Sequence, residues 1–137
     1  AYGYQTVPDP MPSNGTVVPN SDGLADVWKR TSVCLVPSWY ESYGLSAVEA
    51  LASGIPVVAH PTPGLRESMT SPEHGECCLF ADRDDDDAWV AALHELGKPT
   101  VWRRWSKLAR LRAAELDAQT VADLDRLDGW MRSLAAT

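Results

Sequence analysis

The chain has 137 residues, 45% of them apolar, and a net charge of −7 from 12 Lys and Arg against 19 Asp and Glu. This size and composition indicate one globular domain, and no run approaches the ~20 apolar residues of a membrane span. The acidic balance argues against a nucleic-acid partner that is bound by general electrostatic attraction, so we expect no nucleic-acid binding. Cys34, Cys77 and Cys78 lie inside apolar runs, which predicts buried free thiols and a reducing, cytoplasmic setting.

The start of the chain is predicted to be coil. Residues 1–22 contain several prolines and glycines, with room for one short strand near Thr16–Val18. A short helix is expected over 22–30, because its apolar residues recur at helical spacing and its cations lie at the C-terminal end. Ser21 or Asp22 is the expected N-cap of this helix.

The middle of the chain has the pattern of an α/β fold. Short apolar runs without alternation are typical of parallel strands buried on both faces, and three are present, at 33–36, 55–59 and 77–81. Residues 45–53 favour a helix that ends at Gly54. Residues 33–59 therefore predict a strand–helix–strand unit, the building block of a Rossmann-like parallel sheet with flanking helices.

The remainder of the chain is predicted to be helical. Five aspartates in the segment 82–87 precede a helix expected over 88–96, and capping of that helix is the favoured interpretation over a calcium or magnesium site. Two further helices are expected in 100–137, over 100–116 and 120–135, each with an apolar stripe. No linker divides the sequence, so residues 1–137 are interpreted as one domain.

The segment between the first two strands carries the chemistry. Glu41 and Glu49 stand eight positions apart, with Gly44 between them and Glu49 on the expected helix. Ligands of open α/β sheets bind at the carboxyl edge, where helix N-termini favour phosphate and carboxylates accept hydrogen bonds from vicinal hydroxyls of a sugar or a ribose. Ser46-x-x-Glu49 also matches a capping box, which would make Glu49 purely structural. Spacing alone leaves both interpretations open.

The wider context of the two glutamates resembles the nucleotide-sugar site of retaining GT-B glycosyltransferases of family 4. The resemblance spans about residues 14–97 and rests on these segments: Pro37-Ser38, Glu41-x7-Glu49, Tyr43-Gly44-Leu45, Glu49–Gly54, Pro56–Val58, Gly64–Glu67 and Cys78–Phe80. It implies a GT-B C-terminal domain, which we expect to be incomplete because the strand and basic pair that normally open such a domain do not precede the match.

The resemblance implies a role for each matching residue. Glu41 would lie close to the donor sugar as the catalytic residue, and Glu49 would hold the ribose hydroxyls. The remaining expected substrate-binding residues, through backbone amides or polar side chains, are Tyr43, Gly44, Leu45, Ser46 and Arg66. For Arg66, neutralising a phosphate and lying solvated on a helix both stay open. Glu67 is expected to cap a helix, and the three histidines are expected to face solvent or to pack.

The family resemblance also implies the reaction and the partners. The donor would be a UDP- or GDP-sugar, its sugar would be transferred with retention, and no metal or other cofactor is expected. A missing N-terminal domain or partner chain would complete the enzyme, so we expect little turnover from this chain alone. Contact with a membrane is expected only through a lipid-linked acceptor, and a dimer through the exposed sheet edge or the C-terminal helices. The alternatives are a non-catalytic GT-B-like interaction module, a subunit of a split transferase, or a related epimerase or phosphorylase.

Overall fold

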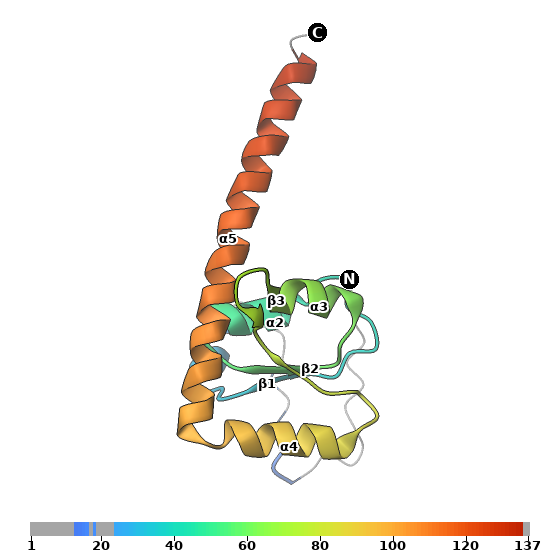
Figure 1. The fold of residues 1–137 in the computed structure, drawn as a ribbon, viewed down its shortest axis with the longest axis vertical. Coiled ribbons are helices and arrows are strands. Elements are labelled where there is room, and N and C mark those ends of the chain that lie inside the picture. The colour runs from blue at the N-terminus through green and yellow to red at the C-terminus, as the bar shows by residue number, and fades with distance from the viewer. Residues whose placement is uncertain (1–12, 17, 19–23, 136–137) are drawn as a thin grey trace.

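The computed structural model describes residues 13–16, 18 and 24–135 (Figure 1). The expected N-caps Ser21 and Asp22 lie outside these residues, as does part of the strand considered near Thr16–Val18. The first described helix is α1, Leu24–Lys29. It lies within the helix predicted over 22–30.

A three-stranded parallel sheet forms the centre of the fold, as predicted. Its strands are β1 (Cys34–Val36), β2 (Val57–Ala59) and β5 (Leu79–Phe80), in the order β1-β2-β5. The third strand is shorter than the predicted 77–81. The backbone N–H of Cys77 donates to the carbonyl of Met69, outside the sheet, so pairing with β2 begins only at Leu79.

Helices cover both faces of the sheet (Figure 1). Helices α2 (Leu45–Ala52) and α3 (Pro63–Met69) lie on one face, and α4 (Asp86–Leu96) lies on the other. Two apolar cores result, one centred on Leu51 and Leu65 and one around Val58. Because β2 is buried on both sides, its unbroken apolar sequence matches its position at the centre of the sheet.

A short antiparallel hairpin follows α3. It consists of β3 (Thr70–Ser71) and β4 (Gly75–Glu76). The Ser71 hydroxyl accepts hydrogen bonds from the backbone N–H groups of Glu73 and His74, which stabilises the turn between the two strands.

The C-terminal part of the chain forms one helix, α5, over Pro99–Ala135. The prediction of two helices is wrong because residues 117–120 contain neither glycine nor proline, so nothing interrupts the backbone ladder. The Thr120 hydroxyl donates to the Leu116 carbonyl, a contact that a continuous helix accommodates.

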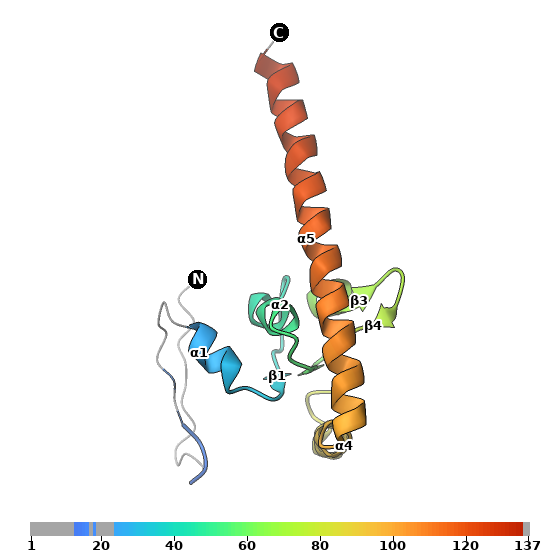
Figure 2. The same ribbon diagram turned by 90° about the vertical axis from the view of Figure 1, so that its left-hand side faces the viewer.

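The two halves of α5 have different surroundings. The first half packs against α2 and α4, and the second extends beyond the body of the molecule (Figures 1 and 2). The extended half exposes the apolar stripe predicted there, namely Val121, Leu124, Leu127, Met131 and Leu134. Within the described residues, no helix combines the length and apolar character needed to cross a bilayer.

The three cysteines are free thiols, as predicted, with Cys77 and Cys78 buried and Cys34 partly buried. Burial raises the pKa of Cys34 to about 11 and also raises the pKa of Cys77 and Cys78. Because the thiolate is the reactive form, a raised pKa disfavours reaction of these cysteines at neutral pH.

Candidate functional site

The loop between β1 and α2 lies at the carboxyl edge of the sheet and contains Glu41. The Glu41 carboxylate is partly buried and accepts a hydrogen bond of 3.1 Å from the Ser38 hydroxyl. The start of α3 packs closely against the backbone of this loop. A Cβ on Gly64 would lie 2.4 Å from the carbonyl oxygens of Glu41 and Ser42, so only glycine permits this close approach.

The turn into α2 is fixed by two further contacts. Gly44 has a φ of +80° and is the N-cap of α2, a conformation that favours glycine. The Ser68 hydroxyl of α3 donates to the carbonyl of Tyr43 at 2.8 Å. Tyr43, Leu45 and Ser46 all face solvent beside this turn, with Leu45 71% exposed. The loop therefore contacts α3 on one side and is open to solvent on the other.

The N-terminus of α2 has unpaired backbone donors. The first intrahelical bond runs from the N–H of Val48 to the carbonyl of Gly44. No described residue accepts a hydrogen bond from the N–H groups of 44–47. The capping-box interpretation of Ser46 and Glu49 is wrong, because Gly44 and not Ser46 is the N-cap and no side chain caps this end. These free N–H groups are the feature with which helix N-termini bind anions.

Glu49 lies one turn further along α2 and is exposed. It borders a hollow of about 440 Å³ between α1 and α2, whose lining residues are Ala25, Trp28, Lys29, Glu49, Ala52 and Ser53. The hollow combines an aromatic face with one carboxylate and one ammonium group. Lys29 also donates to the carboxylate of Asp26 at 3.0 Å.

Arg66 and Glu67 both lie on the exposed side of α3. The guanidinium of Arg66 stacks over the ring of Phe80, with Cζ 5.1 Å from the ring centroid, which places it near the carboxyl end of β5. The expectation that Glu67 caps a helix is wrong, because it lies inside α3 and Thr62 is the cap.

Sequence reasoning missed a cluster of three residues at the same edge. Trp39, His60 and Arg83 follow β1, β2 and β5, respectively. The backbone N–H of Arg83 donates to Nδ1 of His60 at 3.0 Å, and the Arg83 guanidinium stacks on the indole of Trp39 at 4.4 Å. The signal was available, because residues directly after parallel strands meet at one edge of the sheet.

The aspartate-rich segment caps α4, as predicted. The Asp85 carboxylate accepts a hydrogen bond of 2.9 Å from the N–H of Ala88, and Asp86 and Asp87 occupy the first turn. The Asp82 carboxylate accepts from the N–H of Asp84 at 3.1 Å.

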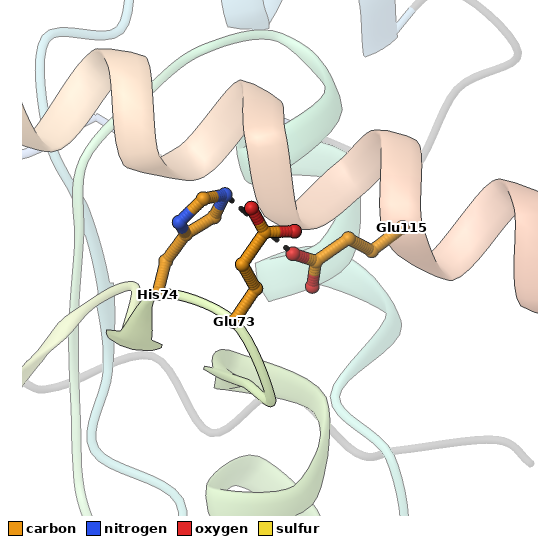
Figure 3. Close-up of side chains that lie close together, drawn as sticks. All are labelled: Glu73, His74 and Glu115. Atoms are coloured by element: carbon orange, nitrogen blue, oxygen red, sulfur yellow. Dashed lines mark ion pairs between the residues drawn. The ribbon is translucent and has the colours of Figure 1, made fainter.

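A separate polar cluster joins the β3–β4 hairpin to α5. Glu73, His74 and Glu115 converge there (Figure 3), and they are the one group in the described residues with the spacing of metal ligands. Both Glu115 oxygens already have partners, the Ser71 hydroxyl at 2.7 Å and Arg112 at 3.0 Å. The Ser71 hydrogen bond and the Arg112 guanidinium hold the pKa of Glu115 below its usual value. The geometry favours a structural role over metal binding: Glu115 links the β3–β4 hairpin to α5 and is called the clamp on α5 below.

Comparisons with known proteins agree with this architecture. A model of the family described as "Glycosyl transferases group 1" matches residues 11–98. Sucrose-phosphate synthase from Thermosynechococcus elongatus has a similar fold, with a TM-score of 0.68 and 31% identity over 83% of this chain and 28% of that protein.

Sequence relatives point to the same family. A D-inositol 3-phosphate glycosyltransferase of Rhodococcus opacus is 41% identical over 55% of this chain and 16% of its own length. An MMP alpha-(1->4)-mannosyltransferase of Mycolicibacterium hassiacum is 37% identical over 77% of this chain and 28% of its own length. The chain thus spans less than a third of the length of these relatives. Together these matches show that the chain belongs to the group 1 glycosyl transferase family.

Proposed function

We propose that this chain forms the donor-binding part of a retaining family 4 glycosyltransferase, in which Glu41-x7-Glu49 is the donor motif. The donor would be a nucleotide diphosphate sugar carrying UDP or GDP, and its sugar would pass to an acceptor that other parts of the enzyme bind. The observation that carries this proposal is the succession of three features along one loop and helix: the Glu41 carboxylate, the unpaired N–H groups of 44–47, and Glu49 at the edge of a hollow.

The three features lie in order along the loop and α2, so that one extended ligand would contact all of them. At a rise of 1.5 Å per residue, Glu49 lies about 7.5 Å along the helix axis from Gly44, and Ser53 lies about 13 Å along it. A diphosphate at the N-terminus of α2 would place its sugar beside Glu41 and its ribose beside Glu49. The base would then enter the hollow that Trp28 and Lys29 border.

The charge distribution is compatible with an anionic ligand in an acidic protein. The chain carries a net charge of −7, so attraction of a diphosphate has to be local. Unpaired N–H groups at a helix N-terminus provide such an attraction without any charged side chain. Arg66, at the carboxyl end of β5, is the cation we propose to assist at the phosphates.

Calorimetric titration of the wild-type chain with UDP- and GDP-sugars tests the proposal. We expect saturable binding to one of the two, and we expect Glu49→Gln to weaken it about tenfold or more, because hydrogen bonds to a carboxylate are lost. Glu95→Gln is the matched control, since Glu95 is an exposed glutamate on α4. Binding that persists unchanged in Glu49→Gln would contradict the role of Glu49.

Absence of binding to the wild-type chain would refute the proposal and favour the non-catalytic interaction module.

The proposal also includes no metal ion or other cofactor, so we expect the affinity for the nucleotide sugar to be the same with and without EDTA. A requirement for a divalent cation would contradict this part of the proposal.

A further inference from the structure

We propose that Arg83 is a positioning residue of the donor site, which holds the loop 37–41 in the conformation that presents Glu41 to the sugar. This inference rests on the proposed function and adds to it a residue that lies far from the donor motif in the sequence. It is argued from contacts between the segments that follow the three parallel strands.

Arg83 contacts the segments after both other strands of the sheet. Its guanidinium Nη1 donates to the carbonyl of Pro37, directly after β1, and its Cζ lies 4.4 Å from the centroid of the Trp39 ring. Its backbone N–H donates to Nδ1 of His60, directly after β2, at 3.0 Å. One residue after β5 therefore connects all three strand ends.

Arg83 contacts the loop after β1 although acidic residues surround it in the sequence. Five aspartates lie within four residues of it in the sequence, yet no described residue forms an ion pair with it. Its guanidinium instead reaches across the edge of the sheet to the loop. A guanidinium can donate from its edge while its face stacks on an aromatic ring, which is the combination that Pro37 and Trp39 require.

The Trp39 side chain is held in place by Arg83 and His60. Its side chain is 68% exposed, so it has little other protein around it to fix its position. Arg83 stacks on the ring, and the His60 ring meets it edge-on at 6.5 Å and 72°. These two contacts hold an aromatic side chain that would otherwise sample several rotamers.

Ser38 connects the restrained residues to the carboxylate. It lies between Pro37 and Trp39, both of which Arg83 contacts, and its hydroxyl donates to the Glu41 carboxylate at 3.1 Å. When the Arg83 contacts are removed, the backbone on both sides of Ser38 is released and the orientation of Glu41 is lost. Binding of the sugar depends on that orientation, whereas binding of the nucleotide depends on α2.

The experiment compares the affinity for a nucleotide sugar with the affinity for the free nucleotide, both by calorimetry. In wild type, the ratio of these two affinities measures how much the sugar contributes to binding. We expect Arg83→Met to weaken nucleotide-sugar binding about tenfold while leaving the affinity for free UDP or GDP unchanged. Arg104→Met is the matched control, because Arg104 is an exposed arginine that stacks on Trp105 of α5, and it should change neither affinity.

A ligand-free measurement accompanies the titrations. The indole N–H resonance of Trp39, assigned with Trp39→Phe, should shift in Arg83→Met and stay in place in Arg104→Met. If Arg83→Met folds poorly, Trp39→Ala removes the same stacking at an exposed position and should give the same selective loss. An unchanged Trp39 resonance, or equal loss of nucleotide and nucleotide-sugar affinity, would overturn the inference. Failure of the wild-type chain to bind any nucleotide sugar would instead refute the proposed function, and the inference with it.

Discussion

Substitution of Gly44 by alanine tests whether the turn into α2 needs glycine for two separate reasons. The first is the backbone, because a φ of +80° lies in the left-handed region. The second is space, because a Cβ at this position would lie 2.5 Å from Cδ2 of Leu65. Leu65 is fully buried in the larger core, so it has no room to move away.

The expected cost of Gly44→Ala follows from these two terms. A left-handed conformation costs an alanine about 1–2 kcal/mol, and overpacking of a filled core costs about 1–3 kcal/mol. The free energy of unfolding should therefore fall by about 2–5 kcal/mol, a large part of the roughly 5–15 kcal/mol available to a domain.

Gly75→Ala separates the two terms. Gly75 has a φ of +74°, but a Cβ there would meet nothing within 4 Å, so only the backbone term applies. Urea unfolding of both variants, followed by circular dichroism, should show a larger loss for Gly44→Ala than for Gly75→Ala by about 1–3 kcal/mol. Equal losses would refute the argument that α3 fixes the turn by close packing.

Three further predictions concern the clamp on α5 and the whole reaction. Because the pKa of Glu115 is lowered in the folded state, its carboxylate stabilises the fold above the unfolded pKa, and this contribution is lost as the pH falls. The difference in unfolding free energy between wild type and Glu115→Gln should therefore shrink from about pH 6 to about pH 3, and a constant difference would contradict the assignment. Arg112→Met should cost about 3–5 kcal/mol in urea unfolding, because it leaves the buried Ser68 carbonyl and the second carboxylate oxygen of Glu115 without their donor. Arg104→Met should cost less than about 0.5 kcal/mol. This chain alone should show little or no sugar transfer in a radiolabelled-donor assay, since each missing transition-state contact lowers the rate about 10²–10³-fold; robust turnover would contradict it.

The sheet and its helices followed from the sequence because they depend on local patterns. The apolar runs, the segment closed by Gly54 and the aspartates before α4 each have one strong physical interpretation, and the structure has an element at each of them. The prediction of two helices that meet near residue 118 was wrong because no strong local pattern marks an end there. Each of the two predicted helices has an apolar stripe, but no residue between them disrupts a helix, so both stripes belong to one continuous helix.

The candidate site was only partly predictable. Glu41, Gly44 and Glu49 lie within one stretch of sequence, so a motif identifies them. His60 and Arg83 are marked in the sequence only by their positions just after two predicted strands, and their contact with each other depends on the pairing of β2 with β5. The capping box failed because Gly44 can adopt a left-handed conformation and begin the helix two residues before Ser46.

The contacts of the buried Arg112 connect α5 to the loop between β1 and α2. Arg112 of α5 is 5% exposed and donates to the carbonyls of Glu67 and Ser68, at 3.0 and 2.9 Å, which fixes the C-terminal end of α3. The hydroxyl of the same Ser68 donates to the carbonyl of Tyr43. Ser68 therefore joins the first half of α5 to the turn that exposes the N–H groups of α2. The first half of α5 thus contributes to the position of the loop between β1 and α2. This loop is held by two sets of contacts: those of α3, which α5 fixes in turn, and those of Arg83 from the segment after β5.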